Sequence, residues 1–321
     1  MENQEPESRC GSSNMDLDSD FYGDEKTVSA LEARVENFDF VSWWASRRPV
    51  LANGSNNQQH PSTNTATTTF TTAPANTPQG RLHNPYEGEP YAWDFAEPIS
   101  SFLSRLPPAT TDWRPGHDWI WVANPYQPPH ERPDQALTCF LKGGRERLAH
   151  FSDFEQTASA AAAASRSATA RAIVSQDVDK ERREAVADLQ RLAVACGVLT
   201  GKWMLFPEPG NVNEVWGKVA RATAGGELGV GAKVATRVDP EKARLICIYT
   251  RDFRDKDDVA RVLNRMRELE LVRPGERQIY YKTDAWTHLD IYGGNGWGIA
   301  ASMYSSNQIF SYIRTLSSRA A

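Results

Sequence analysis

The sequence has little of what metal centres, disulfide-bonded folds and membrane proteins require. Its four cysteines, Cys10, Cys139, Cys196 and Cys247, are scattered and form no CxxC pair. This spacing argues against a structural zinc site and for a reducing compartment. No apolar run approaches the roughly 20 residues that span a bilayer. The first eleven residues are polar and acidic, unlike a signal or transit peptide. We therefore expect a cytoplasmic or nuclear protein with no membrane partner.

Catalytic signatures are also missing from the sequence. It has no GxSxG nucleophile elbow, no HExxH pair and no GxxxxGKS/T phosphate loop. The glycine-rich segment from Gly225 ends in Lys233 and fails the phosphate-loop pattern, so we interpret it as a helix stop followed by a turn. His288 and Asp290 lie two apart on a predicted strand, either as a structural pair or as an acid–base pair. Cys247 lies in an apolar strand and is interpreted as an unreactive core thiol. We expect no enzyme, no cofactor and no metal.

Charge is distributed unevenly along the chain, whose formal net charge is −5. Residues 1–40 contain eleven acidic and three basic residues, a balance of −8, whereas residues 200–321 contain eighteen basic and fourteen acidic residues, a balance of +4. A mildly basic C-terminal region allows an anionic partner. It falls short of the excess typical of strong nucleic-acid binders, and a solvated mixed-charge surface is the alternative interpretation.

Composition divides the chain into three parts. Residues 1–52 form an acidic arm, expected to be disordered apart from a short helical and aromatic segment that contains Phe38, Phe40, Trp43 and Trp44. These aromatic residues either anchor the arm on the folded domain or dock on a protein partner. Residues 53–82 are rich in Thr, Asn, Ala and Pro, have no apolar period and are interpreted as a flexible linker. The folded domain is predicted over residues 83–321.

Hydrophobic periodicity in this domain predicts a mixture of helices and strands. Helices are expected over residues 98–106, 134–154 with a break at Gly143 and Gly144, 177–196, 211–224 and 255–269. The Ala-rich run 158–164 is either a helix extension or a loop. Strands are expected over 117–122, 202–207, 232–238, 245–250, 279–282, 287–292 and 297–303, with a glycine turn over 293–296. Mixed elements and short connections favour an α+β fold, in which helices pack on one face of a curved antiparallel sheet.

Aromatic residues on or near the predicted strands are the main functional signal. Tryptophans are usually core residues, but several on one concave sheet face can stack a nucleobase while basic neighbours meet phosphates. The candidate ligand-binding residues are Trp119, Trp121, Lys233, Arg237, Tyr249, Arg251 and Trp286. Trp119 and Trp121 share one face of their strand because side chains alternate along it. The pattern indicates RNA or nucleotide binding.

The order of these motifs resembles a known fold. A strand opening with Gly201-Lys202-Trp203 precedes a helix with Trp216, the paired strands 231–237 and 245–250, and Tyr280-Tyr281. This order is similar to the C-terminal half of the cap-binding translation initiation factor 4E, where Gly-Arg-Trp opens the corresponding strand. The segments 118–122, 199–207 and 281–298 look like the family typified by the basophilic leukaemia-expressed protein, which has an initiation factor 4E-like fold and no established activity. The resemblance covers roughly residues 85–310.

The resemblance to the cap binder is incomplete at its ligand site. The cap binder has a Trp-Glu pair shortly before the Gly-Arg-Trp strand, whereas this chain has no Phe, Tyr or Trp between Phe154 and Trp203. Arg237 matches the phosphate-contacting Arg, Leu245 replaces a Lys, and Tyr249 replaces a third Trp. We therefore expect a non-enzymatic binding protein, with RNA or a nucleotide as its ligand. The alternative is a protein-interaction module that uses the aromatic arm or the helical face.

Overall fold

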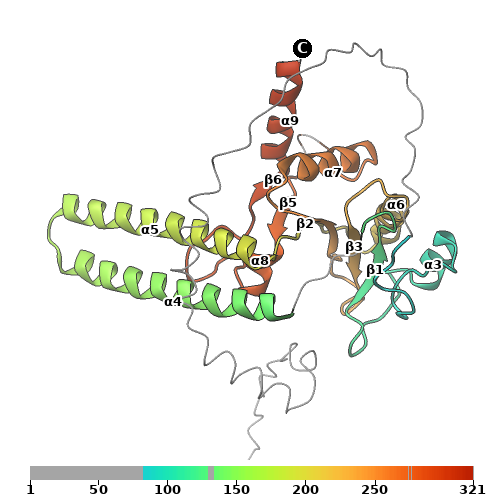
Figure 1. The fold of residues 1–321 in the computed structure, drawn as a ribbon, viewed down its shortest axis with the longest axis horizontal. Coiled ribbons are helices and arrows are strands. Elements are labelled where there is room, and N and C mark those ends of the chain that lie inside the picture. Colours follow the sequence, from blue (N-terminus) through green and yellow to red (C-terminus); the bar gives the residue numbers. More distant parts are fainter. Residues whose placement is uncertain (1–81, 129–133, 274, 276, 321) are drawn as a thin grey trace, which may run out of the picture. The chain divides into compact units, whose positions relative to one another are not determined.

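The computed structural model describes residues 82–128, 134–273, 275 and 277–320, which all belong to one compact unit (Figure 1). The predictions for the acidic arm, and for the linker up to residue 81, lie outside the described residues. The prediction for Phe38, Phe40, Trp43 and Trp44 is one of these, because all four residues lie outside the described part of the chain. In the part of the chain that is described, no helix has both the length and the apolar character needed to cross a membrane.

An open antiparallel sheet of six strands organises the described unit. The strands are β1 (Trp119–Ala123), β2 (Gly201–Leu205), β3 (Gly231–Ala235), β4 (Ile246–Thr250), β5 (Tyr280–Thr283) and β6 (Tyr304–Ser305). They lie in the order β1-β3-β4-β2-β5-β6, and every neighbouring pair is antiparallel. Only β3–β4 and β5–β6 are both adjacent in the sheet and consecutive in sequence, so the remaining pairings join distant parts of the chain.

The core lies between one face of this sheet and the helices. The helix α6 (Val212–Ala224) packs against β1 and β3, and α7 (Lys256–Glu268) packs against β4. The face of the sheet beneath these helices is apolar and includes Ile120, Val234 and Ile248, all fully buried. Trp203 belongs to the same face, because its Nε1–H donates to the Val259 carbonyl of α7 at 3.1 Å. The predicted α+β fold, with an antiparallel sheet and helices on one face, is confirmed.

Further helices flank this core. α3 (Ile99–Arg105) packs against α6, and α9 (Ser306–Ala320) packs against α7 and β6. α4 (Asp134–Ala164) and α5 (Ala168–Ala195) form an antiparallel hairpin, shown in green and yellow-green in Figure 1. Arg147 of α4 joins the two helices through ion pairs with Glu181 at 2.7 Å and Asp188 at 2.8 Å. The Ala-rich run 158–164 therefore extends a helix.

The predicted break at Gly143 and Gly144 is wrong, because α4 continues through both glycines. A Cβ at Gly144 would lie 2.7 Å from Leu289 Cδ2, so a larger residue there would have to displace the Leu289 side chain where α4 approaches the end of α8 (Asp284–His288). The cost of a glycine inside a helix is only about 1 kcal/mol. Close packing of two elements can outweigh that cost.

Two predicted strands near the C-terminus are also wrong. Residues 287–292 begin in the short helix α8, and residues 297–303 form no strand and lead into β6. The Thr283 side chain ends β5 and caps α8 by accepting from the Ala285 amide at 3.3 Å, which turns the chain directly from strand to helix. His288 therefore ends a helix, while Asp290 lies beyond it with a positive φ of 56°. The predicted arrangement of these two residues on one strand face does not exist.

The glycine segments behave as turns. Gly225 is the C-cap of α6, and Gly226 has a φ of 77°, so the predicted helix stop is confirmed. The segment 293–296 is also a turn, with Gly294 at a φ of 77°, but it joins α8 to an irregular segment and does not join two strands.

Candidate functional site

The sheet face opposite α6 and α7 has a different composition from the core face. Side chains alternate along a strand, and directly paired residues share a face. One row across the sheet therefore contains Trp121, Lys233, Cys247 and Met204, and the next contains Tyr249, Lys202 and Lys282. We call this surface, with Trp119, the lysine–aromatic face.

Lys233 lies at the centre of the aromatic part of this face. Its Nζ is 3.8 Å from the ring centroid of Trp119, 4.8 Å from that of Trp121 and 5.8 Å from that of Tyr249. Contacts of an ammonium group with aromatic rings at such distances are attractive. Burial lowers the pKa of Lys233 to about 8, an effect that neighbouring Lys202 reinforces.

The other two lysines lie side by side on β2 and β5. Lys202 donates from Nζ to Asp284 Oδ1 at 2.6 Å and to Thr287 Oγ1 at 3.1 Å. The second Asp284 oxygen accepts from the Thr200 hydroxyl. Lys282 Nζ lies 3.8 Å from the ring centroid of Tyr292. Burial, followed by repulsion from Lys202, lowers the pKa of Lys282 to about 8.

Two neutral groups separate these cations. Burial raises the pKa of the Cys247 thiol, so this group stays protonated at neutral pH, and the residue is 1% exposed. Burial also raises the pKa of the Tyr249 phenol well above its ordinary value. The face therefore presents uncharged sulfur and phenol groups between positively charged ammonium groups.

The edge of the sheet supplies a further aromatic wall. The Trp121 main chain pairs with the preceding segment, donating to Tyr91 O at 2.9 Å and accepting from Trp93 N at 3.0 Å. The Tyr86 ring centroid lies 4.8 Å from that of Trp121, on a ring tilted by 32°, and the Tyr249 centroid lies 6.3 Å from it at 21°. Trp121 thus has aromatic neighbours both on the sheet and in the edge segment.

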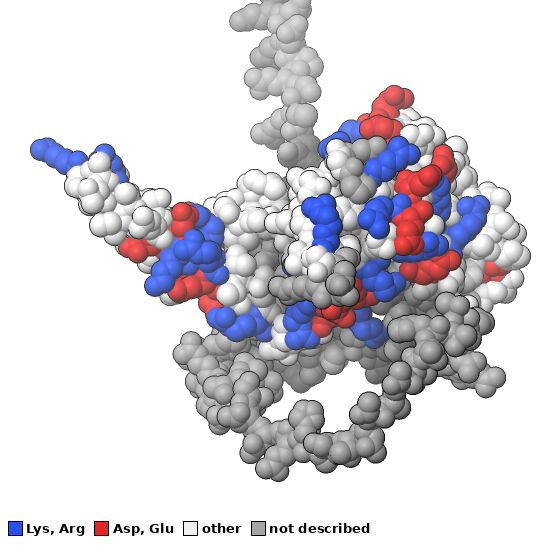
Figure 2. All heavy atoms as spheres, turned by 90° about the horizontal axis from the view of Figure 1, so that it is seen from above, with Lys and Arg blue, Asp and Glu red and all other residues white. Residues whose placement is uncertain are grey.

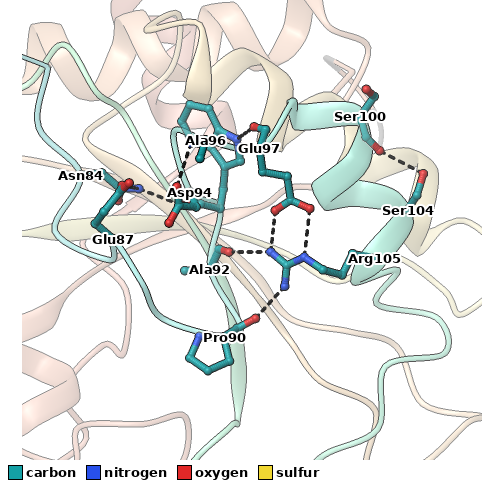
Figure 3. A network of polar contacts seen from close by, with 11 residues as sticks. Asn84, Glu87, Pro90, Ala92, Asp94, Ala96, Glu97, Ser100, Ser104 and Arg105 are labelled. Carbon is teal, nitrogen blue, oxygen red and sulfur yellow. Dashed lines mark hydrogen bonds and ion pairs between the residues drawn. The ribbon is translucent and has the colours of Figure 1, made fainter.

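A polar network holds this edge segment in place (Figure 3). Arg105 of α3 donates to Glu97 at 2.6 and 3.0 Å, and to the carbonyls of Pro90 at 2.7 Å and Ala92 at 3.0 Å. Asn84 donates to Trp93 O at 2.7 Å and accepts from the Tyr86 amide at 3.0 Å. These bonds position Tyr86 and Tyr91 at the outer edge of β1.

The structure brings together four of the seven predicted site residues: Trp119, Trp121, Lys233 and Tyr249. Arg237 follows β3, where its Nε pairs with Asp112 at 2.7 Å. Arg251 follows β4 and donates to Gln127 Oε1 at 3.1 Å and Pro128 O at 3.2 Å. Trp286 is 2% exposed and donates to Ala300 O at 3.1 Å, so it is part of the interior.

Sequence reasoning missed Lys202 and Lys282. A signal for both was present, because each lysine is adjacent in sequence to a large aromatic residue, Trp203 or Tyr281, that is fully buried. In a strand with period two, the neighbour of a core aromatic residue points to the opposite face. The acidic partner Asp284 had no such signal, since α8 was not predicted.

Charge elsewhere on the molecule is arranged differently. Figure 2 shows acidic and basic side chains interspersed over the surface that it displays. On α7, Arg261 pairs with Asp258 at 2.8 Å and Arg265 pairs with Glu227 at 2.5 Å. Among the described residues, no group of three or more His, Cys, Asp or Glu side chains is placed to hold a metal ion.

The fold and the site together define a class of α+β protein whose open sheet carries lysine and aromatic side chains on the face away from its helices. The model of the basophilic leukemia-expressed protein Bles03 family matches residues 31–290. The chain therefore belongs to this family, as its sequence motifs predict.

Solved structures with similarity to the chain include two of eIF4E-3 from Ascaris suum. One, in complex with an m2,2,7G cap, is 19% identical with a TM-score of 0.26 and covers 34% of this chain. The other, in complex with an m7G cap, is 20% identical with a TM-score of 0.25 and also covers 34% of this chain. The matches span 58% and 57% of the length of those chains.

Proposed function

We propose that this protein is a binding protein and not an enzyme, and that its lysine–aromatic face takes RNA or a nucleotide. One observation carries the proposal: Lys233 lies among Trp119, Trp121 and Tyr249, on the same face as Lys202 and Lys282. Aromatic rings next to ammonium groups can bind both the base and the phosphate of a nucleotide, because the base stacks on the rings and the phosphate is attracted to the cations.

The chemistry of the face favours binding with little specificity for the base or the sequence of the ligand. Stacking of a base on an aromatic side chain contributes about 1–3 kcal/mol and depends little on base identity, since every base has a π-face. Lysine acts on a phosphate as a point charge, without the two-pronged geometry of arginine. We therefore expect modest discrimination among bases and a clear dependence of affinity on salt.

The test is a titration of the full chain with a methylated cap analogue, GTP and a short single-stranded RNA, followed by tryptophan fluorescence at several salt concentrations. Trp119 and Trp121 are partly exposed, so their emission should change on stacking, and the other eight tryptophans of the chain, of which Trp203, Trp216 and Trp286 are buried, contribute the remaining fluorescence. Salt-sensitive quenching by RNA without preference for the cap analogue is the expected result. Selective quenching by the cap analogue would identify a cap reader, and silence with all three ligands would overturn the proposal.

A matched pair of lysine variants assigns the binding to the face. Lys233→Met should weaken RNA binding about tenfold at low salt and reduce the slope of log affinity against log salt by about 1, because one phosphate contact is lost. Lys242→Met is the control, since this lysine has a 78% exposed side chain on the loop between β3 and β4. Equal affinities of both variants would exclude Lys233 from the binding surface.

A further inference from the structure

The lysine–aromatic face contains more positive charge than its own side chains neutralise. Lys202 and Lys282 are directly opposed on β2 and β5, and only 7% and 5% of their surfaces are exposed. Like charges opposite each other on neighbouring strands destabilise a sheet, and the effect grows when water is excluded. Such a pair therefore calls for negative charge between or beside the two ammonium groups.

The carboxylate that is present neutralises only one of these lysines. Asp284 forms its ion pair with Lys202 at 2.6 Å. Within the described residues, neither Lys282 nor Lys233 has a hydrogen bond or an ion pair from its ammonium group, and each contacts aromatic rings instead. Asp290 near Lys282 and Asp118 near Lys233 act only at longer range, without an ion pair to these lysines.

Three ammonium groups and one paired carboxylate leave two positive charges without a close partner. An internal phosphodiester of a nucleic acid carries one negative charge, whereas a phosphate monoester carries about two at pH 7 and has three strong acceptor oxygens. Opposed residues on antiparallel strands have Cα atoms roughly 5 Å apart, so two lysine side chains can reach the same phosphate group. Both kinds of phosphate fit this spacing, but only a dianion matches the two charges.

We propose that Lys202 and Lys282 bind a terminal phosphate, so that the ligand is a nucleotide or a single strand ending in a phosphate monoester. This inference rests on the proposed nucleotide or RNA binding of the same face. Lys233, on β3, adds the third charge and lies between this phosphate and the stacking rings of Trp119 and Trp121. The base would then lie toward β1 and the phosphate toward β5.

Above neutral pH, binding of a terminal phosphate should be accompanied by protonation of Lys233 and Lys282. A phosphate monoester has its second pKa near 6, so it stays a dianion from pH 7.5 to 9.5. Lys282 and Lys233, both with a pKa of about 8, lose their charge across that interval. The groups around them are Lys202, Asp284, Asp290, Asp118 and Cys247. The affinity for a terminal phosphate should therefore fall with rising pH, because the two lysines lose their charge while the phosphate keeps its own.

The experiment compares short fluorescent oligonucleotides of one sequence, with a 5′-hydroxyl, a 5′-phosphate or a 3′-phosphate end, binding to the full chain. We expect a phosphorylated end to raise affinity about tenfold at pH 7.5, in line with charge-assisted hydrogen bonds, and to lose most of that gain at pH 9.5. Inorganic phosphate should compete with the phosphorylated oligonucleotide. In Lys282→Met, the ratio of the affinity for a phosphorylated end to that for a hydroxyl end should be close to 1. In Lys242→Met, this ratio should stay near ten.

The outcomes separate this inference from the function on which it rests. Equal affinity for hydroxyl and phosphate ends would overturn the terminal-phosphate site and leave RNA binding intact. A preference that survives in Lys282→Met would also overturn it, provided that an unfolding curve shows the variant to be folded. If none of the oligonucleotides binds and GTP and the cap analogue also fail to bind, the proposed function itself fails.

Discussion

Lys282 illustrates at the scale of a residue how a binding group opposes stability. Folding places its ammonium group beside Lys202 in a buried position, and the pKa falls from 10.5 to about 8. We predict that Lys282→Met makes the fold about 1–2 kcal/mol more stable at pH 7, since each unit of pKa shift corresponds to about 1.4 kcal/mol and solvent screens part of it. Urea unfolding of the variant and the wild type measures this difference.

The pH dependence of that difference has a definite sign. Between pH 8 and 10.5 the unfolded chain holds the Lys282 proton more tightly than the folded chain does, so wild-type stability gains from rising pH. The advantage of Lys282→Met should therefore shrink from pH 7 to pH 9.5. Lys242→Met should match the wild type at both pH values. A Lys282→Met protein that is less stable than the wild type at pH 7 would contradict the assigned cost of this charge.

At the scale of an element, β2 depends on the glycine that opens it. A Cβ at Gly201 would lie 2.3 Å from the Tyr281 hydroxyl and 2.5 Å from Tyr281 Cζ. The ring cannot easily move away, because Tyr281 is fully buried and its hydroxyl is 2.6 Å from Thr250 Oγ1. Gly201→Ala should cost about 2 kcal/mol, within the range for overpacked cores.

Gly210→Ala is the matched control for this prediction, because a Cβ at Gly210 would meet nothing within 4 Å. Its free energy of unfolding should stay within about 0.5 kcal/mol of the wild type, as for ordinary surface substitutions. Chemical denaturation of both variants gives the comparison. If the two substitutions had equal effects, the close approach of Tyr281 would not be the reason for the glycine.

At the scale of the whole described unit, the hairpin of α4 and α5 is joined to the sheet through the segment after α8. Trp297 donates from Nε1 to Ser152 Oγ on α4 at 3.0 Å, and its carbonyl accepts from Arg182 Nε on α5 at 2.9 Å. Arg182 also pairs with Glu155 at 3.2 Å, which ties the two helices together at this point.

We predict that Trp297→Ala loosens this junction and leaves the sheet intact. Amide hydrogen exchange should become about tenfold faster in residues 292–300 and in the adjacent turns of α4 and α5, because the contacts of Trp297 contribute to the free energy of local opening there. Exchange in β3 and β4 should not change. Phe154→Ala, at an exposed aromatic residue of α4, should leave all of these rates unaltered. Faster exchange throughout the sheet would mean that hairpin and sheet unfold as one cooperative unit.

Local pattern in the sequence determined most of the elements and one face of the sheet. The helix over residues 255–269 was predicted from its hydrophobic periodicity. α7 confirms it, and Asp255 caps α7 by accepting from Asp258 N at 3.0 Å. Alternation along a strand is enough to place Trp119 and Trp121 on one face. These features depend on residues within a few positions of each other, and backbone geometry alone relates such residues.

The tertiary structure determined which residues that are distant in the sequence become neighbours. α4 continues through Gly144, where it packs closely against Leu289, and α8 (Asp284–His288) takes up the start of the strand that was predicted over residues 287–292. Lys202 and Lys282 are eighty positions apart in the sequence, and only the placement of β5 beside β2 makes them neighbours. Local periodicity assigns a side chain to a face, but the order of strands comes from the burial of the whole apolar surface. For this reason the sequence indicated an aromatic and basic site, and only the fold assembled its three lysines.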